Sequence, residues 1–228
     1  MEILPIVLAR GGSKRIPRKN VLPMAGKPMI AWTIECALHT KGLEQVVVST
    51  DDIEIAEVCS SLGAYLPFMR PSELAEDTTT SADVVIHLLE WLSGHGKSLP
   101  EFILLLQPTS PLRIPEDIDA SISLQKERNA DSVVSVCRSS HPFSFLRKIN
   151  DDGRISLVGA GDSDDFFCYL NGAVYLVKTP VFLREKRFIP LDTLAYEMPV
   201  ERSIDVDTPW DFYLADLILK DRYASTYS

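Results

Sequence analysis

Short, mostly apolar runs alternate with helix-periodic segments over the first 140 residues. The apolar runs predict buried strands at Ile3–Leu8, Val46–Ser49, Phe102–Leu106 and Ser132–Val136, with a further short strand at Ala64–Phe68. Helical spacing of apolar residues predicts helices at Pro28–Leu38, 53–62, Ala82–Ser93 and Pro115–Arg128. Alternating strands and helices with short connections predict an α/β fold, with a doubly wound, mostly parallel sheet covered on both faces.

The pattern changes after Arg138. Two β-rich runs, Phe145–Ile149 and Arg154–Val158, flank Asn150-Asp151-Asp152-Gly153, which predicts a hairpin. A third β-rich run covers Phe166–Val177. We therefore expect a small antiparallel insertion over 139–188 within a main α/β domain formed by 1–138 and 189–223.

The insertion is too small to bury a core of its own. Its aromatic side chains need a cover, either a second subunit or a looser lid of the same chain; they are Phe143, Phe145, Phe166, Phe167 and Tyr169. We expect the main sheet to resume at Arg202–Val206. A final helix follows, with Thr208 as its cap and Asp211 completing a capping box.

The loop after the first strand, within Leu8–Asn20, is rich in glycine and positive charge. It contains Gly11, Gly12 and Ser13, and five basic residues: Arg10, Lys14, Arg15, Arg18 and Lys19. Adjacent glycines allow a tight turn that points backbone N–H groups into one concavity, and the cations supply charge opposite to an anion. The pattern favours a polyphosphate cradle over a solvated basic turn. It matches neither the P-loop nor the dinucleotide-binding spacing.

Ligands of parallel sheets bind at the carboxyl ends of the strands. The polar loops expected to converge there are 10–20, 50–52, 70–81 and 107–113. Asp205 and Asp207 lie two apart in an extended segment, so their side chains point the same way. Two carboxylates suit Mg²⁺ held together with substrate phosphates. The plainer alternative makes Asp207 a turn residue and Asp205 an ion-pair partner.

Two further segments are candidates for substrate recognition. The loop Gln107–Arg113 is stiffened by two prolines and lined by polar side chains, which is typical of a specificity loop, although it also leads into a helix. In Asn171-Gly172-Ala173-Val174-Tyr175, the glycine within a strand indicates the close approach of a ligand or backbone, or a plain bulge.

Composition narrows the class of protein. The net charge of −9 over 228 residues argues against a broad nucleic-acid-binding face. No apolar run approaches the roughly 20 residues of a membrane span, and Met1–Leu8 is too short for a signal peptide. The four cysteines lack metal or redox spacing, so we expect free thiols and a cytoplasmic location.

The motifs together resemble a known family. In order along the chain they are Ala9–Lys14, Lys19-Asn20, Ser49–Asp51, Arg70-Pro71, Leu106–Arg113, Asn171–Tyr175 and Ser203–Thr208. The chain resembles the acylneuraminate cytidylyltransferases, or CMP-sialic acid (CMP-nonulosonate) synthetases, from about Ile3 to Leu219. The resemblance implies a nucleotide-diphospho-sugar transferase type of fold, and homodimers in which each insertion helps close the other subunit's site.

The resemblance also implies an activity: CTP reacts with a nine-carbon 2-keto sugar acid, with Mg²⁺, to give the CMP-sugar and pyrophosphate. By motif, the residues that hold the CTP phosphates and ribose are Arg10, Gly11, Gly12, Ser13, Lys19 and Asn20. Arg70 and Ser81 contact the nucleoside. The residues that face the sugar are Gln107, Thr109, Ser110 and Tyr175. Asp205 and Asp207 hold the metal.

This activity agrees with the chemistry of the residues. In-line attack of the anomeric hydroxyl on the α-phosphate needs positioning and charge neutralisation rather than a covalent nucleophile. We expect Arg10, Lys19 and Asp207 to carry the catalysis, with a metal-bound hydroxide and Asp205 both open as proton acceptor.

The sugar is less determined than the reaction. The resemblance to sialate-specific members implies a basic residue just before Asn171, where this chain has Tyr169-Leu170. It also implies a lysine shortly after His141-Pro142, where this chain has Ser144. In the family these positions help hold the sugar carboxylate or its substituents. A related nonulosonate such as legionaminic acid is therefore also a candidate substrate. The alternatives are another keto sugar acid, such as KDO, or a catalytically silent nucleotide-sugar sensor.

Overall fold

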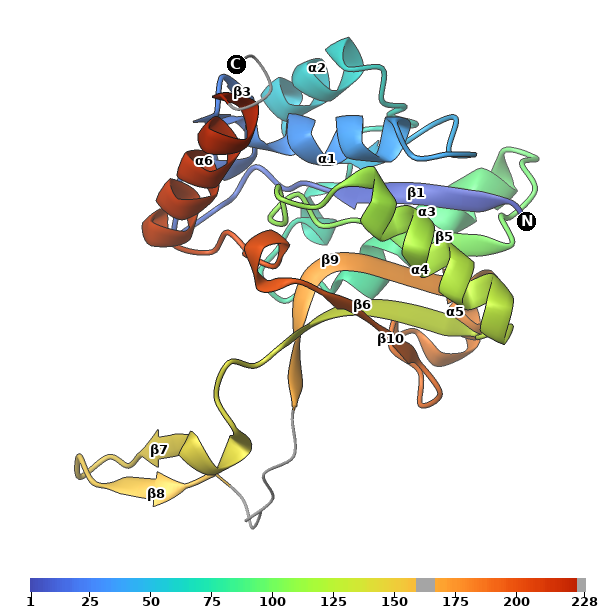
Figure 1. Cartoon of the computed structure of the whole chain (residues 1–228). Helices are drawn as coiled ribbons and strands as arrows, with labels where there is room; N and C mark the ends of the chain where they lie inside the picture. The colour runs from blue at the N-terminus through green and yellow to red at the C-terminus, as the bar shows by residue number, and fades with distance from the viewer. Residues whose placement is uncertain (159–166, 225–228) are drawn as a thin grey trace.

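A six-stranded sheet forms the centre of the molecule (Figure 1), in the computed structural model that describes residues 1–158 and 167–224. The strand order is β10-β6-β9-β5-β1-β4. The strands are β1 (Ile3–Leu8), β4 (Val47–Ser49), β5 (Phe102–Leu105), β6 (Ser132–Arg138), β9 (Cys168–Lys178) and β10 (Leu194–Met198). All neighbouring pairs are parallel except those of β9, which runs antiparallel to β5 and β6. The predicted mostly parallel α/β sheet is confirmed.

Six helices accompany the sheet in the described part of the chain. They are α1 (Met29–Leu38), α2 (Ile53–Ser61), α3 (Ser81–Gly94), α4 (Pro115–Arg128), α5 (Thr179–Glu185) and α6 (Pro209–Ala224). Short 3-10 turns occur at Lys19–Val21, Ser72–Leu74, Phe143–Phe145 and Val200–Arg202. A small hairpin of β2 (Pro23–Met24) and β3 (Lys27–Pro28) precedes α1.

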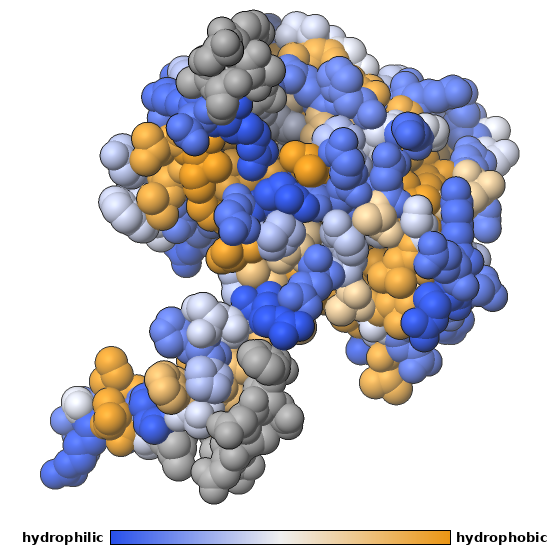
Figure 2. Space-filling model, in the orientation of Figure 1, coloured by the Kyte–Doolittle hydropathy of each residue, from blue (hydrophilic) through white to orange (hydrophobic). Residues whose placement is uncertain are grey.

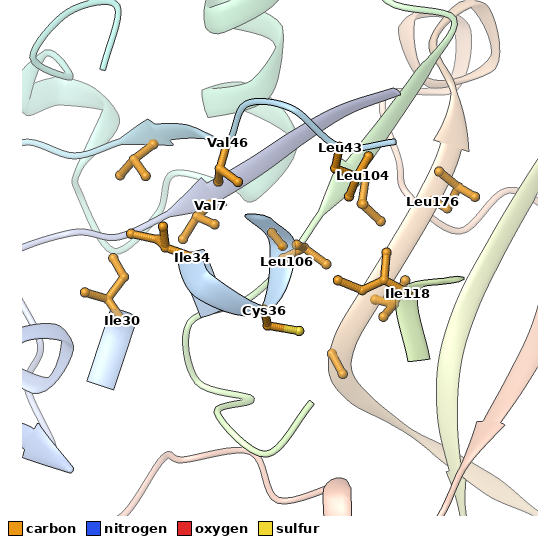
Figure 3. Packing of buried hydrophobic residues seen from close by; sticks show 14 of the residues in the cluster. Val7, Ile30, Ile34, Cys36, Leu43, Val46, Leu104, Leu106, Ile118 and Leu176 are labelled. Atoms are coloured by element: carbon orange, nitrogen blue, oxygen red, sulfur yellow. The ribbon is translucent and has the colours of Figure 1, made fainter. Parts of the chain in front are cut away.

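The core lies on both faces of the sheet because successive strand side chains point to opposite sides. Val7 and Leu104 pack with Ile30, Ile34 and Ile118, on the face of α1 and α4 (Figure 3). Their neighbours Ile6, Ile103 and Leu105 pack against α3 and α5 on the other face. This double coverage explains why β1 and β5 read as continuous apolar runs.

A thin extension, residues 139–158, leaves the domain after β6; we call it the arm (Figure 1). It contains the predicted hairpin, formed by β7 (Arg147–Ile149) and β8 (Ile155–Leu157). Its apolar side chains are open to solvent: Phe145 is 68% exposed, Ile149 73% and Ile155 68%. Figure 2 shows hydrophobic residues on the surface of the arm, which extends away from the domain. Phe166, expected to share this exposure, lies outside the described residues.

Three strand predictions need correction. Ala64–Phe68 forms only one bridge, between Val47 and Tyr65. The strand β9 lies in the middle of the main sheet, so the domain resumes at Cys168 and the insertion is shorter than 139–188. The main sheet ends with β10, whereas Arg202–Val206 is not a strand. The sequence analysis did not predict β10, a five-residue edge strand in which half-buried and exposed side chains alternate before the buried Met198.

Candidate active site

A cavity of about 560 Å³ opens at the carboxyl ends of β1 and β5. Its walls come from segments far apart in sequence: Leu8, Arg10, Ser13, Lys14, Arg15, Lys19, Asn20, Ser81, Leu105, Gln107, Pro108, Thr109, Asp205 and Asp207. The basic loop, the loop after β5 and the paired aspartates therefore share one cleft, as the sequence predicted. The 50–52 loop does not line the cavity. It contacts the basic loop through the hydrogen bond from the Gly11 N–H to Asp51.

The two glycines of the basic loop have separate roles. Neither has a positive φ, so a left-handed turn is not the reason for them; Arg18 has that conformation instead, with φ of 57°. The Gly11 N–H donates to Asp51 Oδ1 at 3.0 Å, and a Cβ on Gly11 would lie 2.6 Å from Asp52 Oδ2. A Cβ on Gly12 would meet nothing within 4 Å, so the backbone there is open to a ligand.

Arg10 and Lys14 of the cavity wall pair with an acidic side chain of an adjoining cavity, Asp77. Arg10 Nη1 donates to Asp77 Oδ1 at 2.9 Å, and Lys14 forms an ion pair with the other oxygen of Asp77. Hydrogen bonds from Lys14 and Arg10 lower the pKa of the Asp77 carboxyl below its usual value. Asp77 thus lies where an anionic ligand of these cations would bind. Sequence reasoning placed its loop at the crevice but did not single out Asp77.

The opposite wall repeats this pairing. Lys19 Nζ donates to the Val206 carbonyl at 2.6 Å and lies 3.5 Å from Asp207 Oδ1, while Arg15 Nη1 lies 3.3 Å from Asp207 Oδ2. Lys19 and Asp207 therefore face the same space, which is the condition that a shared phosphate-binding site requires.

Asp205 and Asp207 fit a divalent cation by their chemistry. Loss of solvent around the Asp205 carboxyl raises its pKa, a hydrogen bond from Thr109 opposes this, and the nearby charge of Asp207 raises it further. A cation between the two carboxylates would relieve this repulsion. No cluster of three or more His, Cys, Asp or Glu side chains with metal-binding geometry occurs among residues 1–158 and 167–224. Ligand oxygens would therefore complete the coordination of Mg²⁺.

Buried polar contacts fix the Gln107–Arg113 loop. Arg113 is buried and donates to the Ala173 carbonyl at 2.7 Å, to Thr33 Oγ1 at 2.8 Å and to the Gln107 carbonyl at 3.3 Å. Burial lowers its pKa below the usual value. Sequence reasoning treated Arg113 as part of a polar loop; the structure makes it the internal support of that loop.

Two residues expected at the sugar are not in the cavity wall. Ser110 is fully buried and donates to the Asn171 carbonyl at 3.1 Å. Tyr175 is half-buried on β9 and packs edge-to-face on Phe188 at 6.1 Å. Gln107 and Thr109 do line the cavity.

Gly172 lies at a bulge and also meets the close approach of another group, two of the alternatives that the sequence left open. It has a φ of +75°, next to the register shift between Val134 and Val136 on β6. A Cβ there would lie 2.5 Å from Gln107 Oε1. The glycine therefore serves a bulge and also the close approach of a cavity-lining side chain.

Among the described residues, Asn20 has a free acceptor atom for a ligand, whereas Arg70 already donates to protein atoms. Asn20 is buried and donates to the Arg10 carbonyl at 3.2 Å, but its Oδ1 has no hydrogen-bond partner in the part of the chain described. Because an unpaired buried oxygen is costly, this atom is suited to accept from a ligand hydroxyl. Arg70 is buried and donates to Ser49 Oγ at 3.0 Å and to the Ser49 carbonyl; burial lowers its pKa to about 10. Arg70 and Ser81 line an adjoining cavity of about 260 Å³.

Two solved structures show the same fold. A CMP-2-keto-3-deoxy-manno-octonic acid synthetase complexed with CTP aligns with a TM-score of 0.74 at 18% identity, over 97% of this chain and all of that one. A 4-diphosphocytidyl-2C-methyl-D-erythritol synthase from Anaerococcus prevotii aligns with a TM-score of 0.68 at 14% identity, over 96% of each chain. At these identities the likeness concerns the fold alone.

No helix in the described part of the chain is long and apolar enough to cross a membrane.

Sequence relatives are closer. A CMP-N,N'-diacetyllegionaminic acid synthase of Legionella pneumophila is 36% identical, over 96% of this chain and 97% of its own. N-acylneuraminate cytidylyltransferases of Escherichia coli and Streptococcus agalactiae are 34% and 37% identical; this chain spans about half of their length, 51% and 52%. The profile of the cytidylyltransferase family matches residues 4–155. The chain therefore belongs to the cytidylyltransferase family, and the resemblance predicted from its motifs is confirmed.

Proposed function

We propose that this protein is a cytidylyltransferase that joins CTP to a nonulosonic, sialic-acid-like 2-keto sugar acid, giving the CMP-sugar and pyrophosphate. The observation that carries the proposal is the meeting of Lys19 and Asp207 in the cavity that also holds Arg10. The relatives support the substrate class, because they are named for legionaminic acid and N-acylneuraminate. We further propose a cytoplasmic location.

Each wall contributes a different part of the reaction. Arg10, Lys14 and Lys19 bind the triphosphate, and their charges stabilise the negative charge that develops on the α-phosphate and the departing pyrophosphate. The open backbone at Gly12 lets phosphate oxygens approach, while Asn20 Oδ1 accepts from a ribose hydroxyl. Gln107 and Thr109 orient the keto acid so that its anomeric hydroxyl lies in line with the α-phosphate.

Asp205 and Asp207 would hold Mg²⁺, which when bound neutralises phosphate charge and lowers the pKa of a nearby hydroxyl. Arg15 and Lys19 pair with the Asp207 carboxylate. These cations must exchange Asp207 for phosphate oxygens when CTP binds. Asp77 must likewise release Arg10 and Lys14.

A panel of keto sugar acids tests the activity. Purified protein, CTP and Mg²⁺ are incubated with sialic, legionaminic, pseudaminic and KDO-type acids, and pyrophosphate release is measured. We expect turnover with at least one nine-carbon acid. Turnover with the eight-carbon KDO alone would replace the proposed substrate class, and CTP binding without turnover on any acid would favour a sensor.

Asp207→Ala tests the metal pair. We expect a loss of turnover of about 10³-fold, a size typical when one charge-stabilising group is removed, with unchanged circular dichroism. Asp131→Ala is the matched control, because Asp131 also pairs with a lysine, Lys178 at 2.8 Å, at the opposite end of the sheet. Near-normal turnover in Asp207→Ala would remove the metal assignment.

We also propose that the protein is a homodimer through the arm. Phe145, Ile149 and Ile155 are large apolar side chains that the described chain leaves mostly exposed, as is typical of residues that a partner covers. Ile149→Asp should convert the protein to a monomer in sedimentation velocity. A wild-type protein that sediments as a monomer at micromolar concentration would contradict the dimer.

A further inference from the structure

The segment that carries the two aspartates of the cavity is not part of the sheet. Ser203–Asp207 follows the 3-10 turn Val200–Arg202 and precedes α6, with no strand of its own. Its position therefore depends on individual contacts rather than on a ladder of backbone hydrogen bonds. One such contact lies inside the segment, where the Val206 N–H donates to the Thr109 carbonyl at 2.7 Å.

The start of the segment is held by a buried carboxylate. Asp117 lies in the first turn of α4 and is fully buried. Arg202 forms a two-pronged pair with it, through Nε to Oδ2 at 3.0 Å and Nη2 to Oδ1 at 2.7 Å. The Tyr196 hydroxyl adds a third hydrogen bond, to Oδ1 at 3.1 Å. Such planar, charge-assisted forks fix direction as well as distance.

The same carboxylate also contacts the residue that follows the Gln107–Arg113 loop. Asp117 Oδ2 accepts from the Ile114 N–H at 3.1 Å, immediately after the loop Gln107–Arg113. One side chain therefore ties the end of the substrate loop to a residue three positions before Asp205. A second buried side chain, Asn171, donates to Ser203 Oγ at 2.9 Å and keeps the same segment against β9.

We propose that Asp117 is a positioning residue, which acts through Arg202 to fix the Asp205/Asp207 pair relative to the Thr109 wall and so sets the affinity for the divalent cation. The inference rests on the proposed function, since it gives the paired aspartates a metal to hold. Neither Asp117 nor Arg202 is part of the cavity wall. Groups outside a metal's ligand set that orient its ligands commonly change metal affinity or activity by about 10- to 100-fold.

The chain offers a matched control pair. Arg138 and Glu197 also form a two-pronged contact, at 3.0 and 3.1 Å, between β6 and β10. Both side chains are about half exposed, and neither lines the cavity. Glu197→Gln therefore weakens a two-pronged ion pair on β10, the strand that also carries Tyr196, outside the cavity wall.

The test measures metal binding apart from turnover. Mn²⁺ is titrated into wild type, Asp117→Asn, Arg202→Lys and Glu197→Gln in the presence of CTP, with free Mn²⁺ followed by electron paramagnetic resonance. We expect Asp117→Asn to weaken Mn²⁺ binding by about 10-fold or more, and Arg202→Lys by less, because lysine keeps the charge but loses the fork. CTP affinity measured in EDTA should change less than about 2-fold, and Glu197→Gln should match wild type.

Folding is monitored by urea unfolding, because breaking a buried ion pair also destabilises. If Asp117→Asn lacks a cooperative transition, Arg202→Lys decides the question with the same measurements. Mn²⁺ affinities of the folded variants within 2-fold of wild type overturn the proposal, as does weakening of equal size in Glu197→Gln. A wild-type protein that binds CTP and Mn²⁺ but turns over no keto acid refutes the proposed function and leaves this inference intact.

Discussion

The α/β domain and the arm use apolar side chains in opposite ways. In the domain, Phe102 is 1% exposed and lies within a core that covers both faces of the sheet. In the arm, Phe145 is 68% exposed, and the hairpin that follows it packs against no other layer of the described residues. Burial within the described chain therefore stabilises the domain, whereas it contributes little to the stability of the arm.

The largest expected effect separates the two regions by stability. Phe102→Ala should lower the free energy of unfolding by about 3–5 kcal/mol, because it leaves a cavity in a closed core. Phe145→Ala should change it by less than about 0.5 kcal/mol in dilute protein. Urea unfolding at two protein concentrations measures both. A cost for Phe145→Ala that grows with concentration would show that a partner chain covers the arm.

The next effect asks whether the domain alone binds the nucleotide. Lys19→Ala should weaken CTP binding by about 10- to 100-fold, the 1.5–3 kcal/mol typical of a hydrogen bond to a charged group. Lys148→Ala, an exposed lysine of the arm, should leave CTP affinity unchanged. Isothermal titration calorimetry measures both variants. Equal losses of CTP affinity would mean that the arm also takes part in nucleotide binding, so that the domain does not bind CTP alone.

Two glycines with positive φ sharpen the comparison. Gly153 in the arm hairpin has φ of +79° and open space around it, whereas Gly172 has φ of +75° and the side chain of Gln107 against it. Alanine at either position costs about 1–2 kcal/mol for the left-handed backbone. Gly172→Ala should additionally displace Gln107 and raise the KM for the keto acid. Thermal unfolding and steady-state kinetics distinguish the two; an unchanged KM would separate Gln107 from substrate binding.

The smallest effect concerns pH. The raised pKa of Asp205 means that its charged form is disfavoured in the folded state, so it destabilises the protein above the folded pKa. This penalty is absent below the unfolded value, about 3.9. Asp205→Asn should therefore be more stable than wild type at pH 7, by about 0.5 kcal/mol or less given solvent screening, with no difference at pH 3. Unfolding curves at both pH values measure it; a less stable variant at pH 7 would contradict the assignment.

Local sequence pattern predicted the elements that carry a strong local signal. β1, β5 and the helix α4 were predicted within a residue of their bounds, because apolar runs and a proline at the first helical position are local signals. β9 was predicted as a strand but assigned to the insertion, since its place between β5 and β6 is a long-range choice. The same reason applies to Ala64–Phe68, whose apolar residues pack on the core with only one bridge to β4.

The sequence by itself determined the cation-rich loop, the paired aspartates, the α/β class and the family, because each is written in residue type and short spacing. Only the tertiary structure decided which acids face those cations. The pairing of Asp77 with Arg10, the Arg202–Asp117 fork and the burial of Arg113 join positions that are distant in the chain. Such contacts depend on how whole layers pack, and no local periodicity records that packing.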